Sequence, residues 1–282
     1  MRYYTGQHRF YAGVDLHART MYTHVLDAQG KTVFAKDLPT DPAVFLAALE
    51  PFRPDLVVGA ECMFSWYWLA DLCQDHSIPF VLGHALAMKH IHQAKTKTDK
   101  IDAAKLAALL RGGLFPMGYV YPRAKRQTRD LLRRRSFFVR QRAQLIAHIV
   151  NTNTQFNLPV LPKKLTYAAN RTADLIDRFA DPSTKLAVTA DLGLIDGYDG
   201  QIAELERYLV RHAKVDDPVT FGLLRTVPGI GPILGLALLY EDDIARFPEP
   251  GNFLSYSRLV RARTRAPARR RGPARRRSAT PT

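Results

Sequence analysis

Four carboxylates fall where a metal-dependent site could form. Each stands at the end of a predicted strand or at the start of a predicted helix: Asp15, Glu61, Asp99 and Asp102. The spacing of three between Asp99 and Asp102 places both on one helical face, where like charges repel unless a cation lies between them. Mg²⁺ prefers oxygen ligands, and two such ions about 3.5–4 Å apart activate a nucleophile and stabilise a leaving oxygen in phosphodiester chemistry. Together the four residues form a candidate site for Mg²⁺ or Mn²⁺.

Each of these residues has a simpler explanation when it is considered alone. Asp15 could cap a turn, Asp99 could be a helix N-cap, and a neighbouring lysine could supply the positive charge in place of a metal ion. His17 could act as a general base, although a histidine in a loop usually has no catalytic role. Large side chains near Glu61 are expected to lie in the hydrophobic core: Met63, Trp66, Tyr67 and Trp68.

The segments that would position the carboxylates predict a mixed sheet. The stretch 9–17 predicts a strand that ends on Asp15, and residues 55–61 predict a nearly continuous apolar strand that ends on Glu61. A glycine-containing turn between two alternating segments predicts a hairpin. The hairpin strands are expected at 21–27 and 31–38, a further strand at 78–83, and helices at 41–52 (with Thr40 as a possible N-cap), 66–76 and 99–111.

This order of elements is that of a ribonuclease-H-type sheet. In such a sheet the first and fourth strands are neighbours, so Asp15 and Glu61 would lie side by side. The helix that follows can bring Asp99 and Asp102 to the same edge. The predicted fold class is therefore α/β plus α, with a mixed-sheet domain over residues 1–122 and helical regions after it.

The first helical region is predicted over residues 123–220. Leu131, Phe138 and Leu145 recur every seven residues, and the apolar residues between 195 and 209 step by three and four. Both stretches fit an antiparallel coiled coil, although a plain helical bundle would show the same spacing.

An incomplete helical C-terminal domain is predicted over residues 221–260. In it, Gly229 and Gly231 lie between two apolar helical runs. The pattern resembles a helix-hairpin-helix motif, in which glycines let backbone N–H groups approach a phosphate.

The charge of the chain indicates a polyanionic partner. The net charge is +15, from 41 basic and 26 acidic residues. Residues 122–142 are rich in arginine, and such a run is either a solvated helix face or a stripe that binds phosphates. The positions expected to contact nucleic acid are Lys95, Lys97, Lys100, Arg126, Arg129, Arg133, Arg134, Arg135, Arg140, Gly229 and Gly231.

The two cysteines and the hydropathy predict a cytoplasmic protein that does not enter a membrane. Cys62 and Cys73 have no metal-like spacing and are expected to be buried thiols. No apolar run approaches the roughly 18–20 residues of a membrane span. The first residues lack the apolar core of a signal peptide.

Several stretches resemble the DEDD insertion-sequence transposases, the family that includes the Piv-type invertases and the bridge-RNA-guided recombinases. They are AGVDLHARTMYTHVLD, VVGAECMFSWYWLADLC, PFVLGHALAMKHIH, KTDKIDAAKLAALLRGG, TRDLLRRR, VPGIGPILGLALLYE and FLSYSRLV. The resemblance implies a RuvC-like N-terminal domain whose Asp, Glu, Asp, Asp set falls on Asp15, Glu61, Asp99 and Asp102. It also implies a coiled coil, a C-terminal domain that supplies a serine nucleophile to attack DNA, a homo-oligomer and a structured guide RNA.

Residues 261–282 depart from the pattern of that family. The family continues with stretches like ESAGK and KKIGNAHL, whereas this segment has nine arginines, no acidic residue and no large apolar residue. Such a segment cannot form a core and is predicted to be disordered. It could be a nucleic-acid-binding tail. Alternatively it is out of frame, because permitted codons for 264–269 and 275–282 yield ESAGK and KKIGNAH in one shifted register.

The shifted frame has a chemical consequence. The family's serine maps to the replaced segment, and Ser255, Ser257 and Ser278 do not match its context. A truncated copy of this kind would keep its acidic site and lose strand transfer. Two other functions stay open, which are a RuvC-like metal-dependent nuclease and a non-catalytic nucleic-acid-binding protein.

Overall fold

The computed structural model describes residues 2–91 and 98–259, and the chain divides into two compact units at residues 126/127. Predictions that concern Lys95, Lys97 and the segment 261–282 lie outside the described residues. Each unit is considered by itself below.

The first unit is built on a five-stranded mixed sheet with the strand order β4-β3-β2-β5-β6. Its strands are β2 (Phe10–Leu16), β3 (Thr20–Asp27), β4 (Thr32–Pro39), β5 (Leu56–Glu61) and β6 (Phe80–Gly83). The three strands β2, β3 and β4 form an antiparallel meander, and β5 and β6 add in parallel beside β2. This mixed α/β arrangement is consistent with a ribonuclease-H-like fold.

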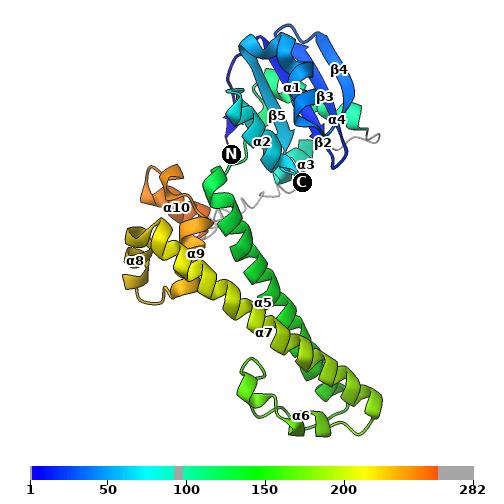
Figure 1. Cartoon of the computed structure of the whole chain (residues 1–282), viewed down its shortest axis with the longest axis vertical. Helices are drawn as coiled ribbons and strands as arrows, with labels where there is room; N and C mark the ends of the chain where they lie inside the picture. The colour runs from blue at the N-terminus through cyan, green and yellow to red at the C-terminus, as the bar shows by residue number, and fades with distance from the viewer. Residues whose placement is uncertain (1, 92–97, 260–282) are drawn as a thin grey trace, which may run out of the picture. The chain divides into compact units, whose positions relative to one another are not determined.

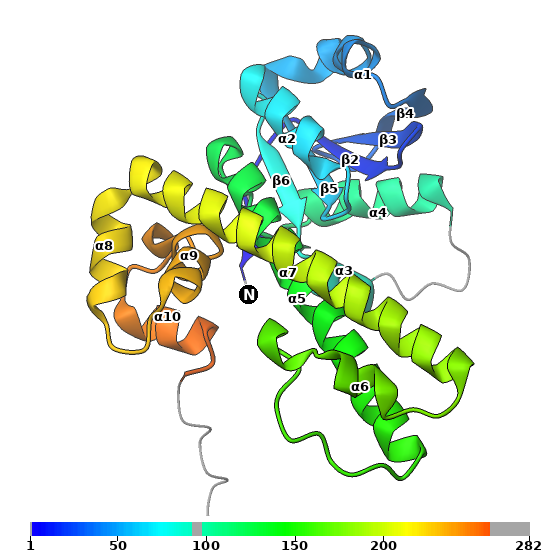
Figure 2. The ribbon, with the colours of Figure 1, turned by 60° about the horizontal axis from the view of Figure 1, so that its bottom comes forward.

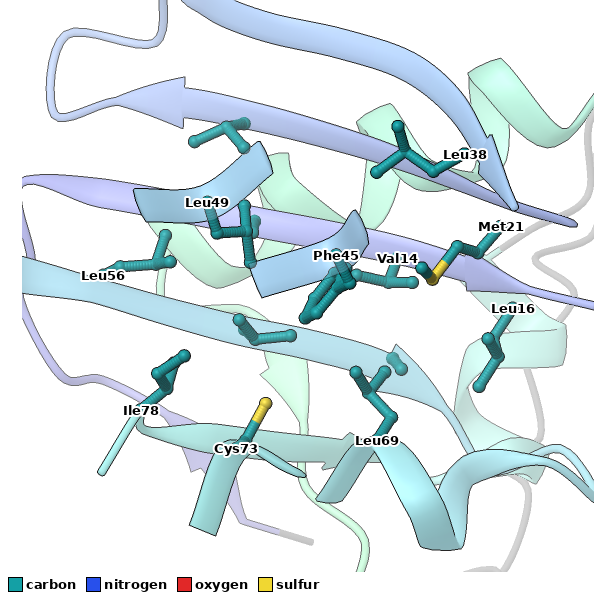
Figure 3. Packing of buried hydrophobic residues seen from close by; sticks show 14 residues of the cluster. Val14, Leu16, Met21, Leu38, Phe45, Leu49, Leu56, Leu69, Cys73 and Ile78 are labelled. Atoms are coloured by element: carbon teal, nitrogen blue, oxygen red, sulfur yellow. The ribbon is translucent and has the colours of Figure 1, made fainter. Parts of the chain in front are cut away.

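Helices cover both faces of this sheet (Figures 1 and 2). They are α1 (Pro42–Leu49), α2 (Trp66–Asp75), α3 (Ala85–Ile91) and α4 (Asp99–Arg111). On one face, Phe45 of α1 and Leu69 of α2 pack with Val14 and Met21 of the sheet (Figure 3). On the other face, Leu106 of α4 packs with residues of β2 and β5. The sheet core is therefore apolar on both sides, as the continuous apolar run of β5 predicts.

Some local predictions for this unit were wrong. Asp41, rather than Thr40, caps α1, because its side chain accepts a hydrogen bond from the Val44 N–H. Met63 and Cys62 are exposed rather than buried, because the segment that follows β5 leaves the sheet before α2 begins. A two-stranded ribbon of β1 (Tyr3–Tyr4) and β7 (Phe115–Pro116), and the helix α3, were not predicted.

Two long antiparallel helices, α5 (Arg123–Gln155) and α7 (Pro182–Asp216), form the centre of the second unit. The first turn of α5 still belongs to the first unit, which ends at Arg126. Their direction follows from three ion pairs in which the residue number rises on one helix and falls on the other: Arg135 with Glu206, Arg142 with Asp199, and His148 with Asp191. Figure 1 shows the two helices side by side.

Short helices pack at both ends of this pair. The connection between α5 and α7 contains α6 (Ala173–Asp177), whose Leu175 joins a buried cluster with Ile149 and Val188. After α7 come α8 (Pro218–Thr226), α9 (Pro232–Tyr240) and α10 (Pro250–Tyr256). Phe221 and Leu236 pack with Leu132 and Leu209 in a second cluster. Each end of the helix pair therefore has its own apolar core.

Candidate functional site

The sheet places Asp15 and Glu61 on adjacent strands. Strands β2 and β5 run parallel, with Val14 opposite Ala60, so the next residue on each strand is one of the two carboxylates. Asp15 is the penultimate residue of β2 and Glu61 is the last residue of β5. This is the neighbouring position that a ribonuclease-H-type strand order predicts.

Helix α4 supplies the other two carboxylates from its first turn. Thr98 is the N-cap and accepts a hydrogen bond from the Ile101 N–H, so Asp99 is the first helical residue and not the cap. Asp102 is buried, and its Oδ1 lies 3.4 Å from Nζ of Lys105. The positive end of the helix dipole favours carboxylates in this first turn.

Gly13 sets the distance between α4 and the strand that carries Asp15. A Cβ atom at this position would lie 2.2 Å from the carbonyl oxygen of Ala103 and 2.4 Å from the backbone nitrogen of Ala107. Real Cβ atoms do not approach backbone this closely, so only glycine permits the contact. The helix therefore lies directly on β2, which brings its first turn beside Asp15.

His17 is the residue of the site to which sequence analysis assigned no definite role. Its Nε2 lies 3.5 Å from Oδ2 of Asp15 and 3.5 Å from Oδ1 of Asp99. One ligand atom from each of these three residues lies within 4.8 Å of the others. The spacing Asp-x-His at a strand end that enters a tight hairpin was the signal that could have identified it.

The carboxylates interact electrostatically around one pocket. Burial raises the pKa of Asp15 above its ordinary value, His17 lowers it, and the charges of Asp99, Asp102 and Glu61 raise it. A pocket of about 350 Å³ is lined by Asp15, His17, Glu61, Met63, Asp99, Asp102 and Leu106. Crowded carboxylate oxygens with this much space between them suit Mg²⁺ or Mn²⁺, which take oxygen ligands.

Several arginines at the start of α5 bind other residues of the protein instead of facing solvent. The prediction that Arg126 contacts nucleic acid was wrong. Its side chain is 1% exposed and lies over the rings of Trp66 and Tyr67, with its Nη1 2.6 Å from Oδ1 of Asp71. A guanidinium that is enclosed in this way cannot reach a phosphate. Its Nε also donates a hydrogen bond to the carbonyl oxygen of Tyr121, but Trp66, Tyr67 and Asp71 lie more than 50 residues away in the sequence, so the local pattern of arginines could not reveal them.

The other predicted arginines divide into paired and outward-facing groups. Arg129 and Arg133 both bind Glu241, and Arg135 binds Glu206. Arg134 and Arg140 are exposed on α5. On α4 of the first unit, Lys100 is also exposed. The exposed side chains are the better candidates for phosphate contacts.

The two glycines of the predicted hairpin lie between α8 and α9. Gly229 has a positive φ of 88°, which favours glycine, and Gly231 is the N-cap of α9. Among the residues that the structure describes, no heavy atom apart from the glycines and their chain neighbours lies within 4 Å of where a Cβ would stand at either glycine. The backbone there is therefore open to a ligand from outside.

Comparison with known protein families identifies the family of the chain. Carboxylates that converge on one pocket can hold the divalent ions that nucleases and polymerases use. Residues 12–157, more than half of the chain, match a family model for DEDD transposases of the IS110 type, described as "Transposase". Residues 222–279 match a second model, described as "Transposase IS116/IS110/IS902 family". The chain belongs to the IS110 family of insertion-sequence transposases, which are enzymes of DNA transposition and recombination.

The second match runs to residue 279 and so includes most of the segment 261–282, whose out-of-frame interpretation stays a prediction. No curated protein matches the chain. Within residues 2–91 and 98–259, none of the helices combines the length and the apolar character that crossing a bilayer requires.

Proposed function

We propose that Asp15, Glu61, Asp99 and Asp102 hold Mg²⁺ or Mn²⁺ and that this centre acts on DNA phosphodiester bonds during transposition. The observation that supports the proposal is the single pocket that all four carboxylates line. Transposases of the DEDD type use divalent ions, and an acidic cluster is present in the structure. The cluster consists of Asp15, His17 and Asp99, and the addition of Glu61 and Asp102 as ligands is part of the proposal.

The protein residues have separable tasks in this proposal. Asp15 and Glu61 are anchored on adjacent strands and provide a rigid pair of oxygen ligands. Asp99 and Asp102 are presented by the first turn of α4, and Lys105 beside Asp102 limits the local excess of negative charge. When bound, divalent ions would stabilise charge on a phosphate and lower the pKa of an attacking group.

The nucleic acid would be held by groups outside the pocket. Lys100, Arg134 and Arg140 are exposed cations, and the hairpin of Gly229 and Gly231 offers an open backbone. Such contacts position a strand through its phosphates and carry no base information by themselves. From the family resemblance we further propose a serine nucleophile of the C-terminal domain, a structured guide RNA and a homo-oligomer.

Strand cleavage tests the proposal. A supercoiled plasmid that carries the ends of the element should be nicked with Mg²⁺ or Mn²⁺ and not with EDTA. Asp15→Asn and Asp102→Asn should reduce nicking by at least about 100-fold, since each removes a charged ligand. Asp75→Asn is the matched control, because Asp75 is the last residue of α2 and lies at the opposite end of that helix from the pocket. Equal activity of all three variants would contradict the proposal.

A simpler nuclease is the second candidate, and one observation favours it. Every residue that lines the acidic pocket belongs to the first compact unit, residues 1–126. A pocket complete within one unit could hydrolyse DNA or RNA without the serine. Strand joining that is absent from this chain but restored by frame correction would indicate the transposase. Nicking that stays without strand joining after frame correction would indicate the nuclease. Metal-independent binding alone would indicate a non-catalytic nucleic-acid-binding protein. The nucleotide sequence across codons 258–282 tests the shifted-frame interpretation and hence the predicted loss of strand transfer.

A further inference from the structure

His17 occupies a fixed position beside the acidic pocket. It follows Leu16, the last residue of β2, in the tight connection to β3. Its N–H donates a hydrogen bond of 2.9 Å to the carbonyl oxygen of Thr20, and its own carbonyl accepts one of 3.0 Å from Oγ1 of Thr40. Hydrogen bonds therefore hold the backbone of His17 at both its N–H and its carbonyl, which fixes the position of the Cα atom that carries the imidazole side chain.

The distances around the imidazole are those of ligands that share an ion. Nε2 lies 3.5 Å from a carboxylate oxygen of Asp15 and 3.5 Å from one of Asp99. These separations exceed the usual N–H···O range of about 2.7–3.2 Å. Two ligand atoms that are each about 2.1 Å from one ion lie about 3.0 Å apart at right angles and about 4.2 Å apart on opposite sides. The two separations from Nε2 fall between these limits.

The type of donor then bears on which ion is preferred. A neutral imidazole nitrogen is a good ligand for transition metals, whereas Mg²⁺ takes oxygen ligands and keeps its waters. Mn²⁺ accepts carboxylates and also tolerates nitrogen. A site with Asp15, Asp99 and His17 would therefore prefer Mn²⁺ to Mg²⁺. A site made of carboxylates alone would show a weaker preference.

We propose that His17 directly ligates the ion held by Asp15 and Asp99, and that this ligand makes the site prefer Mn²⁺ to Mg²⁺. The inference rests on the metal centre of the proposed function and adds a fifth side chain to it. The competing explanation is that His17 is only a counter-cation to the two aspartates in the metal-free protein, and that it leaves the ion's coordination sphere when metal binds.

Pulsed electron paramagnetic resonance of bound Mn²⁺ separates these explanations without an activity assay. The spectrum of the full chain with one equivalent of Mn²⁺ should show ¹⁴N modulation from a coordinated imidazole. Labelling histidine with ¹⁵N should change the modulation frequencies, and His17→Gln should abolish the modulation. His76→Gln is the matched control and should retain it, because His76 follows the last residue of α2, at the opposite end of a ten-residue helix from the pocket.

The affinities provide a second readout. We expect His17→Gln to weaken Mn²⁺ binding about ten-fold, the lower end of what loss of a metal-site partner costs, and to weaken Mg²⁺ binding less. The variant should fold, since the side chain of His17 is 47% exposed and its anchoring hydrogen bonds use the backbone. Equal weakening of both ions would contradict the preference for Mn²⁺.

The outcomes also distinguish this inference from the proposed function. If Mn²⁺ binds in a manner that depends on Asp15, yet ¹⁴N modulation is missing or persists in His17→Gln, the role of His17 is wrong and the metal centre stands. If no binding depends on Asp15, the metal centre and the role of His17 fail together.

Discussion

At the scale of single residues, side chains of the same charge have different roles, which depend on their burial and their partners. Arg126 and Arg134 belong to the same basic run, yet the first is buried against two aromatic rings and the second is exposed. A buried guanidinium with a carboxylate partner contributes to folding, and an exposed one is available to phosphates. The role of His17 likewise depends on its surroundings, because its Nε2 lies beside the carboxylates of Asp15 and Asp99.

Substitution of the arginines should separate these roles. Arg126→Gln should destabilise the first unit by about 3 kcal/mol, because it leaves Asp71 without its closest cation. The salt dependence of DNA binding should not change in this variant. The double change Arg134→Gln and Arg140→Gln should leave the thermal midpoint unaltered. It should reduce the slope of log K against log salt by about 0.9 for each phosphate that the variant no longer neutralises.

The measurements are thermal unfolding and DNA binding by fluorescence anisotropy at several salt concentrations. A folded Arg126→Gln protein with a reduced salt slope would contradict the structural role of Arg126. An unchanged slope in the double variant would show that Arg134 and Arg140 do not bind DNA.

At the scale of elements, close approach of α4 to β2 is what assembles the acidic pocket. Gly13→Ala should cost about 1–3 kcal/mol, since a methyl group would overlap the backbone of Ala103 and Ala107. It should also weaken Mn²⁺ binding, because α4 carries Asp99 and Asp102. Gly197→Ala in α7 is the control. Outside its own stretch of helix, no described residue comes within 4 Å of its Cβ position, and alanine there should be neutral or stabilising by up to about 1 kcal/mol.

Denaturant unfolding and metal titration of the two variants check this prediction. If Gly13→Ala is as stable as the wild type and binds Mn²⁺ equally well, then α4 does not depend on this close approach for its position.

The connection between α5 and α7 depends on a charged network around Asp199. Burial would raise the pKa of Asp199, but hydrogen bonds from Arg142 and Arg171 outweigh burial and hold this pKa below its ordinary value. The side chain of Arg171 is only 3% exposed, and it also binds Asp196. The network therefore ties the segment before α6 to the middle of α7.

A lowered pKa gives this network a defined pH dependence. A carboxyl whose pKa is lower in the folded state stabilises the protein above its unfolded pKa, and this stabilisation is lost as the pH falls through the folded pKa. Asp199→Asn should thus destabilise the second unit by about 2 kcal/mol at pH 7. The difference from the wild type should begin to shrink below about pH 4, the ordinary pKa of an aspartate, and disappear only below the lowered pKa of folded Asp199.

Unfolding of both proteins between pH 2 and 8 measures this difference. Asp177→Asn, which removes an exposed ion pair with Lys185, should change little and serves as the control. A difference for Asp199→Asn that is constant across the whole pH range would argue against the ionic origin of the stabilisation.

At the scale of the whole molecule, repeating patterns in the sequence predict the strands and helices, whereas single tertiary contacts cannot be predicted from the sequence. Alternating apolar strands and their order predicted the mixed sheet, and strand ends predicted that Asp15 and Glu61 would be neighbours. Heptad spacing predicted two long helices. The burial of Arg126 and the approach of His17 depend on tertiary packing and on one tight turn, which no local pattern encodes.

Calorimetric titration of the full chain tests whether the carboxylate pocket binds divalent metal. Mn²⁺ should bind the wild type and the Asp75→Asn control with the same affinity. Asp15→Asn should lose at least about ten-fold in affinity, since a charged ligand is removed at the centre of the pocket. Affinity that is equal in all three proteins, or heat of binding that is absent from the wild type, would show that this pocket is not a divalent-metal site.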